Sequence, residues 1–170
     1  LYDYKDNARK LDQVQAFFKR AQDDKNIVLD GISIIGYASP EGTYDYNMDL
    51  SGRRATAFAN WVQNRFRFPQ NILTVDWRGE DWEKLRDLVE DSKKNKKYQI
   101  LNIIDNYSIF EGRETKLMNL NGGRTYNYLL ENLFPQLRRT YYRIDYTVRP
   151  FTAEESREII KEKPQQLSVF

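Results

Sequence analysis

The feature that most constrains the fold is a strand, a tight loop and a helix that follow one another in residues 27–55. Residues 27–35 form a short apolar run rich in β-branched side chains, which predicts a strand. A turn containing Pro40 follows, and apolar residues then recur at helical spacing. The predicted helix carries the adjacent cations Arg53 and Arg54. Because ligands of α/β proteins commonly lie at the carboxyl ends of strands, this stretch indicates a site for an anionic group.

The composition excludes several classes of function. The 170 residues are enough for one domain with a real core, and 31% charged beside 40% hydrophobic residues is typical of a soluble globular domain. A net charge of +2, with acidic residues interleaved among basic ones, is too small for a general nucleic-acid binder. The sequence has no cysteine and no histidine, which excludes thiol catalysis, thiolate metal sites and histidine bases. We therefore expect a non-catalytic domain with no metal and no cofactor.

The sequence also predicts no membrane-spanning segment, because it contains no run of about 18 apolar residues. It starts at Leu1 instead of methionine and ends on the apolar pair Val169 and Phe170. We expect it to be a fragment of a longer protein, with targeting signals lost upstream.

Periodicity predicts alternating helices and strands along the rest of the chain. A second strand is expected over 72–77 and a third over 142–148, whose alternating pattern exposes one face. Residues 98–107 fit a helix, although a strand remains an alternative. The strands over 27–35 and 72–77 should be parallel and joined by a right-handed crossover, which makes the fold class α/β. Another helix is expected to carry Leu50, Phe58, Val62 and Phe66 toward the core and to end before Pro69. The remaining helices are expected over 6–21, 82–90, 113–120 and 125–137, and from a capping box at Thr152–Glu155 through Lys161.

Residues 47–55 carry the pattern Asn-x-x-Leu-Ser-x-x-Arg-Ala, and residues 36–39 read Gly-Tyr-Ala-Ser. This stretch resembles the motif of the OmpA-like C-terminal domain family, in which Gly-His-Thr-Asp precedes the helical pattern. The resemblance implies an α+β sandwich of βαβαβ type, with a mixed sheet and helices packed on one face. The matching positions are Gly36, Tyr37, Ala38, Ser39, Gly42, Asn47, Leu50, Ser51, Arg54 and Ala55.

The resemblance also predicts how the chain is divided. Residues 1–150 are expected to form the OmpA-like domain, with the family's first strand missing ahead of Tyr4. Residues 79–140 are longer than the family usually carries there and are expected to be a helical insert. Residues 151–170 are expected to form a helix or linker toward a removed region. A missing first strand would leave a sheet edge open, which predicts pairing between copies.

The function implied by the resemblance is non-covalent binding of peptidoglycan in the periplasm of a Gram-negative bacterium, in association with the outer membrane. In that family an aspartate takes the ammonium group of diaminopimelate in the stem peptide, and the motif's arginine takes a carboxylate. Arg54 matches that arginine, and a guanidinium holds a carboxylate bidentately. Ser39 stands where the aspartate belongs, with Glu41 two residues along as a replacement. Tyr37 keeps an aromatic ring in place of the family's histidine.

The candidate ligand-binding residues also have structural interpretations, which stay open here. Arg54 either contacts the ligand or ties the helix to the loop through Glu41 or Asp45. The polar loop residues either contact the ligand or hold the loop through backbone hydrogen bonds. Gly42 is expected at a positive-φ turn position. The full set is Tyr37, Ser39, Glu41, Gly42, Thr43, Asn47, Ser51 and Arg54.

An alternative function is that of an envelope assembly scaffold, which binds another envelope protein and has lost peptidoglycan binding. Ser39 and the large insert motivate this alternative. An enzyme would need carboxylates that converge on a substrate, which the adjacent Glu80 and Asp81 rarely do. The basic pair Arg138 and Arg139 is expected to be a solvated surface.

Overall fold

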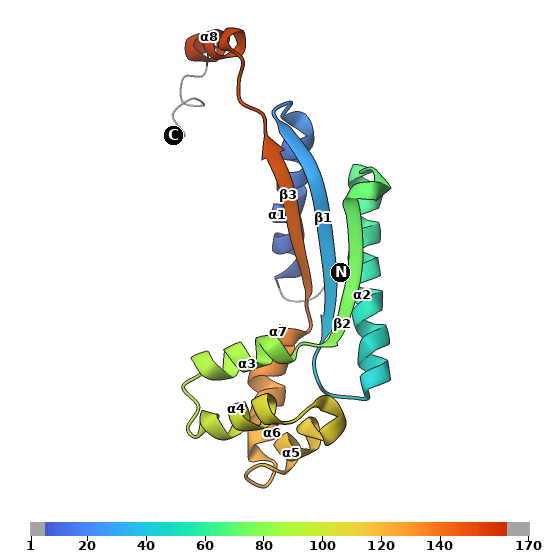
Figure 1. Cartoon of the computed structure of the whole chain (residues 1–170), viewed down its shortest axis with the longest axis vertical. Helices are drawn as coiled ribbons and strands as arrows, with labels where there is room; N and C mark the ends of the chain where they lie inside the picture. The colour runs from blue at the N-terminus through green and yellow to red at the C-terminus, as the bar shows by residue number, and fades with distance from the viewer. Residues whose placement is uncertain (1–5, 163–170) are drawn as a thin grey trace. The chain divides into compact units, whose positions relative to one another are not determined.

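The computed structural model describes residues 6–162 as a mixed α/β protein (Figure 1). Its strands are β1 (Ile27–Ala38), β2 (Leu73–Glu80) and β3 (Thr140–Val148). They hydrogen-bond in the order β2-β1-β3, with β1 and β2 running in one direction and β3 in the other. The mixed sheet and the parallel pair confirm the predicted α/β class. The strand expected ahead of Tyr4 lies outside the described residues, and pairing between copies stays a prediction.

Helices form where the periodicity predicts them, with bounds shifted by a few residues. Residues 98–107 lie mostly in a helix, which resolves the alternative left open by their pattern. No helix in the described part of the chain is both long and apolar enough to cross a membrane. The helices are α1 (Asn7–Asp23), α2 (Tyr44–Phe66), α3 (Trp82–Asp91), α4 (Lys97–Asn106), α5 (Arg113–Asn119), α6 (Arg124–Tyr128), α7 (Phe134–Leu137) and α8 (Ala153–Glu162), with 3-10 turns at Gln70–Ile72 and Ile109–Glu111.

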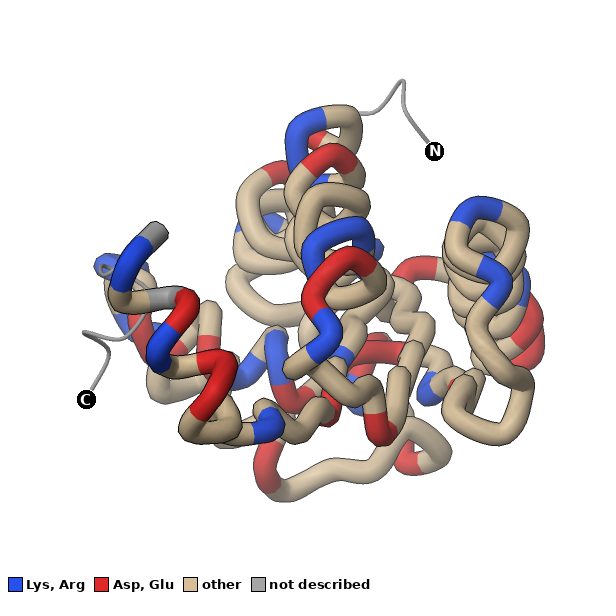
Figure 2. Tube along the Cα trace, turned by 90° about the horizontal axis from the view of Figure 1, so that it is seen from above, with Lys and Arg blue, Asp and Glu red and all other residues tan. Residues whose placement is uncertain are grey.

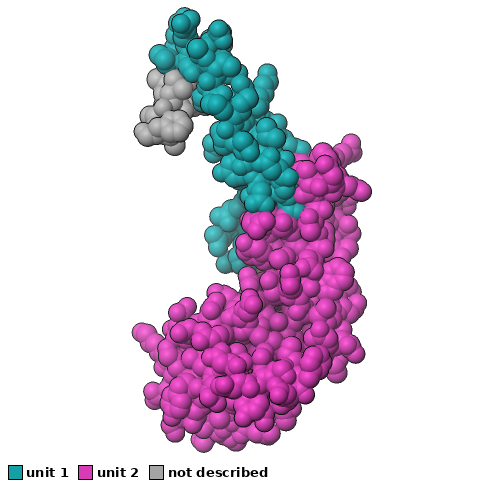
Figure 3. Space-filling view, viewed as in Figure 1, with its two compact units in different colours: residues 1–32, 144–170 teal, residues 33–143 magenta. Residues whose placement is uncertain are grey.

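The described chain divides into two compact units (Figure 3). One contains the residues up to 32 and those from 144 onward, and the other contains residues 33–143. Basic and acidic residues are interleaved along the chain trace, as the composition indicates (Figure 2). The predicted domain boundaries, 1–150 and 151–170, stay a prediction.

In the first unit, α1 packs through its apolar face and α8 begins at the predicted cap. The ring of Phe17 in α1 meets that of Tyr146 in β3 edge to face, with centroids 5.9 Å apart. The Thr152 N–H donates to the Glu155 carboxylate, and the Glu155 N–H donates to the Thr152 hydroxyl, which completes the capping box. Hydrogen bonds from Arg149 and Thr152 lower the pKa of Glu155 to about 2. The chain after β3 is therefore a capped helix, as predicted.

In the second unit, α2 lies very close to β1 and β2, and glycines make this approach possible. A Cβ on Gly36 of β1 would lie 2.0 Å from the carbonyl oxygen of Ser51 in α2. The Ser51 hydroxyl donates to the Met48 carbonyl oxygen at 2.8 Å and accepts from the Gly79 N–H of β2 at 3.0 Å. Gly79 has φ +66°, and a Cβ there would lie 2.7 Å from Met48 Sδ. These contacts fix α2, and with it Arg54, over the carboxyl ends of the strands.

The expected insert consists of helices α3 to α7, which share a core of their own. The segment expected as one helix over 125–137 contains α6, a π-helical turn at Leu129–Leu133 and α7. Pro135 explains the difference, because it has no N–H for the i→i−4 ladder, and the Phe134 N–H bonds to the Leu129 carbonyl instead. The buried core residues are Trp82, Leu85, Val89, Ile100, Ile104, Leu117, Tyr126, Leu129, Leu133, Phe134 and Leu137.

The insert begins and ends beside the carboxyl end of β1. At its start, the Asp81 N–H donates to the Ala38 carbonyl oxygen at 3.0 Å. At its end, the Tyr37 N–H donates to the Arg139 carbonyl oxygen at 2.9 Å. The insert is thus hydrogen-bonded to the strand that precedes the loop at residues 39–43.

Replacing Gly36 with alanine tests the close approach of α2. Gly36→Ala should destabilise the protein by about 3 kcal/mol or more, because the new methyl group meets backbone that cannot rotate away. Gly31→Ala on the same strand is the matched control, since its Cβ would find the nearest atom at 3.6 Å. We expect the control to stay within about 1 kcal/mol of the unsubstituted protein. Urea unfolding followed by circular dichroism measures both, and equal losses would contradict the close approach.

Candidate functional site

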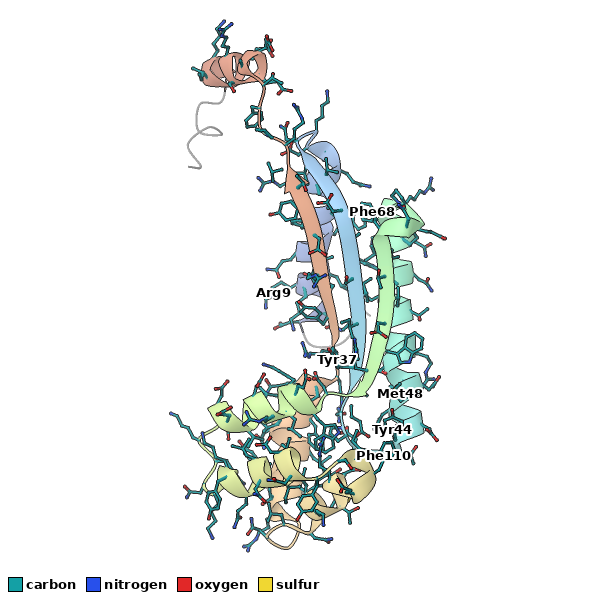
Figure 4. The ribbon with its side chains drawn as sticks, in the orientation of Figure 1. Arg9, Tyr37, Tyr44, Met48, Phe68 and Phe110 are labelled. Atoms are coloured by element: carbon teal, nitrogen blue, oxygen red, sulfur yellow. The ribbon has the colours of Figure 1, made fainter. Side chains whose placement is uncertain are left out.

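Arg54 projects from α2 toward the end of β1, as the sequence predicts. Its Nη1 donates to the carbonyl oxygen of Tyr37 at 3.0 Å, and its side chain is half-buried. Tyr37 lies near the carboxyl end of β1 (Figure 4). This bond orients the guanidinium at the strand end. Glu41, one of the two acidic partners that sequence allowed for Arg54, forms a salt bridge with a different arginine.

That arginine is Arg138, which follows α7 at the end of the insert. Its Nε donates to the Ser39 hydroxyl at 3.2 Å, and its Nη2 donates to the Glu41 carboxylate. Ser39 is 4% exposed, so its hydroxyl faces this guanidinium and not solvent. The side chains of Arg138 and Glu41 keep 35% and 32% of their surface exposed. A cation of the chain itself therefore lies on the two loop residues that sequence reasoning assigned to an ammonium group.

Arg139, the next residue, binds Asp81 and lies against Tyr37. Its Nε donates to Asp81 at 2.7 Å, and the Asp81 side chain is only 2% exposed. Its guanidinium lies over the ring of Tyr37, 4.7 Å from the centroid. Burial, and then the nearby charge of Asp81, raise the pKa of the Tyr37 hydroxyl. The expectation that Arg138 and Arg139 form a solvated surface holds only in part: Arg138 is exposed and Arg139 half-buried, and both bind acidic side chains of the chain itself.

Asn47 holds the loop against the end of β2. It is fully buried, and its Nδ2 donates to Glu80 Oε1 at 2.9 Å. The second oxygen of Glu80 accepts from the Trp82 indole N–H at 2.7 Å. The Thr43 hydroxyl caps α2 by accepting from the Tyr46 N–H at 3.3 Å. Both polar residues thus have the structural roles that sequence allowed as alternatives to ligand contact.

Gly42 and Ser51 also have structural roles. Gly42 has φ +106°, as expected for a turn glycine, and a Cβ there would lie 3.7 Å from the amide oxygen of Asn47. Ser51 is completely buried between α2 and β2. Of the candidate residues with polar side chains, Ser39, Asn47 and Ser51 are buried, whereas Tyr37, Glu41, Thr43 and Arg54 are half-buried or exposed.

The insert places a further carboxylate, Glu114, near Glu41 and Glu80, and sequence reasoning missed it. Glu114 of α5 accepts a hydrogen bond from the Tyr126 hydroxyl. Burial raises the pKa of Glu114, and the charges of Glu80 and Glu41 raise it further. Burial and the bond to Glu114 also raise the pKa of the Tyr126 hydroxyl. No motif marks this cluster, because its members come from the loop, β2 and the insert.

An aromatic contact links the insert to the start of α2. The rings of Tyr44 and Phe110 meet edge to face with centroids 5.5 Å apart (Figure 4). Phe110 remains 83% exposed although it lies in the insert. The insert therefore contacts both ends of the loop at residues 39–43: Arg138 binds Ser39 and Glu41, and Phe110 packs against Tyr44, which follows the loop.

A surface groove lies elsewhere, along α2 and β2. It has a volume of about 530 Å³ and continues into a neighbouring groove of about 390 Å³. Trp77 and Thr56 line both parts, and none of the candidate ligand-binding residues lines either. Within residues 6–162, no group of acidic side chains is arranged to hold a metal ion.

Comparisons with known proteins agree with the motif. The model of the OmpA family matches residues 5–100. The chain is also similar to outer membrane protein 41 of Porphyromonas gingivalis (strain ATCC BAA-308 / W83), with 37% identity over 49 residues. That match covers 29% of this chain and 12% of the relative, so the chain spans only a small part of the relative's length. No solved structure matches significantly.

Removing the Arg139 guanidinium tests whether it neutralises the buried Asp81. Arg139→Met should cost about 2–3 kcal/mol, less than the 3–5 kcal/mol of a fully buried pair because the arginine is 35% exposed. Arg53→Met is the control, since its pair with Asp49 is 61% and 64% exposed and should change stability by about 0.5 kcal/mol or less. Chemical denaturation measures both variants. A loss no larger for Arg139→Met than for the control would refute the anchoring role.

The raised pKa of Glu114 predicts a pH-dependent stability. A carboxyl group whose folded-state pKa lies above its unfolded value binds its proton more tightly in the folded state. Its contribution to stability therefore rises as the pH falls through the raised pKa. Glu114→Gln, which can still accept from Tyr126, should be more stable than the unsubstituted protein at pH 7, with the difference shrinking toward pH 4. Thermal melts across this range measure it, with Glu131→Gln on an exposed position as control.

Proposed function

This chain belongs to the OmpA family and is a cell-envelope domain, and from that premise we propose that it binds peptidoglycan stem peptides non-covalently. The site is the loop at residues 39–43 together with α2, and Arg54 receives a carboxylate of a diaminopimelate-containing stem. The domain acts in the periplasm of a Gram-negative bacterium, in association with the outer membrane. The name of the relative, an outer membrane protein, supports this location.

The observation that carries the proposal is the placement of Arg54. The family pattern over 47–55 puts this arginine one turn beyond Ser51 of α2. The Ser51 hydroxyl is hydrogen-bonded to Met48 in the same helix and to Gly79 of β2, which fixes this part of the helix. Its guanidinium reaches the end of β1 and is oriented by the Tyr37 carbonyl. A pre-oriented guanidinium loses little entropy when it binds a carboxylate bidentately.

The ammonium group of the stem peptide needs an anion, and Glu41 supplies it in this proposal. Ser39, at the position of the family's aspartate, is buried and already accepts a hydrogen bond. Glu41 lies on the same loop, and its side chain is 32% exposed. A carboxylate also binds an ammonium group more strongly than a serine hydroxyl does.

The domain is proposed to be non-catalytic, and the adjacent carboxylates of Glu80 and Asp81 support this. Glu80 accepts from Asn47 and from the Trp82 indole. Asp81 accepts from Arg139 and from the Lys84 N–H at the start of α3. Both carboxylates are engaged in holding the loop and the insert together, which supports a structural role for them.

A second candidate function is an assembly scaffold that binds another envelope protein and no cell wall. The observation that favours it is Arg138, whose guanidinium lies on Ser39 and Glu41. The insert would then carry the contact surface, with Phe110 as its most exposed apolar side chain among those described.

Binding to purified peptidoglycan distinguishes the two functions. The unsubstituted protein should sediment with peptidoglycan, and Arg54→Ala should weaken this binding by about tenfold or more, the worth of a charge-assisted hydrogen bond. Arg53→Ala is the matched control, because Arg53 is the neighbouring arginine and its pair with Asp49 is exposed. Equal binding by all three proteins would remove Arg54 from the site. Absence of binding by the unsubstituted protein would favour the scaffold.

A further inference from the structure

We propose that Arg138 is the residue that sets the specificity of this site, by competing with the ligand's ammonium group for Glu41 and Ser39. This inference rests on the proposed function and concerns the same loop. Arg138 reaches Glu41 across 97 residues of sequence and Ser39 across 99, so the insert delivers a cation to a loop that lies far from it in the chain.

The chemistry of the contact is that of the ligand's own group. A guanidinium and an ammonium are both cations that only donate hydrogen bonds, and both bind carboxylate and hydroxyl oxygens. Arg138 donates to one of each, the Glu41 carboxylate and the Ser39 hydroxyl. A diamino acid presented to this loop therefore meets oxygens that already hold a cation, and it binds only by displacing the Arg138 side chain.

The contact is built so that displacement is feasible. The Arg138–Glu41 pair is about one-third exposed on each side, and ion pairs of this kind contribute little to stability. Glu41 Oε2, in contrast, is buried and has no hydrogen-bond partner among the described residues. Glu41 thus keeps an acceptor that Arg138 does not satisfy and that an ammonium with three N–H donors can use.

Arg139 keeps the competitor in place. Its bond to the buried Asp81 and its backbone bond to Tyr37 fix the chain directly beside Arg138. Arg139 is therefore an anchor, because its partner Asp81 is buried. Arg138 is the displaceable side chain, because its partner Glu41 is partly exposed. The guanidinium of Arg138 is therefore present at a high effective concentration beside Glu41. For this reason the weak Arg138–Glu41 pair competes effectively with a ligand in solution.

Titration calorimetry with the free stem tripeptide L-Ala-γ-D-Glu-meso-diaminopimelate tests the inference. Arg138→Gln removes the charge and should bind the tripeptide about tenfold more tightly than the unsubstituted protein. Arg138→Lys keeps the cation and should stay near the unsubstituted affinity. A tripeptide acetylated on the side-chain amino group of its diaminopimelate has no ammonium there, so Arg138→Gln should not bind it more tightly than the unsubstituted protein does. If the substitution only loosened the loop, the affinity for both peptides would change alike. Circular dichroism checks that each variant folds.

The outcomes separate this inference from the function on which it rests. Equal affinity of Arg138→Gln and the unsubstituted protein overturns the competition while leaving the peptidoglycan site in place. Weaker binding by Arg138→Gln overturns it too, because Arg138 would then contact the ligand. An equal gain by Arg138→Lys or with the acetylated peptide overturns the role of charge. Failure of every variant to bind overturns both the competition and the proposed function.

Discussion

The geometry of the site depends on how closely α2 approaches the sheet. Glycine is needed at 36 because the main chain of Ser51 occupies the space of a side chain, and the Ser51 hydroxyl bonds the main chain of β2. A helix held this close brings the side chain of Arg54 to the end of β1. Arg54 reaches the Tyr37 carbonyl for this reason. The small residues of the motif therefore position the charged one.

Local sequence predicted the fold well, because each element carries its own signals. The β-branched run predicted β1, and the capping box at Thr152 predicted α8. The pattern over 47–55 predicted α2 and also indicated the family. Pro135 shows the limit of periodicity, since apolar spacing over 125–137 reads as one continuous helix. The missing N–H of a single residue turns its middle into a π-helical turn.

The candidate site was predictable only in part, because several of its contacts join residues that lie far apart in the sequence, and residue spacing cannot show such contacts. The motif gave Arg54 its position at the strand end. Nothing local indicated that Arg138 would lie on Ser39 and Glu41, or that Glu114 would lie near both Glu41 and Glu80. An arginine pair between a helix and a strand usually reads as solvated surface. Here both arginines have partners that lie more than fifty residues earlier in the sequence.

The two ends of the insert are hydrogen-bonded to neighbouring residues of one strand, at Tyr37 and Ala38. These two bonds hold the beginning and the end of the segment close together at the end of β1. Insertions are tolerated best where the two ends of the inserted segment lie close together. A different helical segment that made the same two end contacts would therefore fit between β2 and β3.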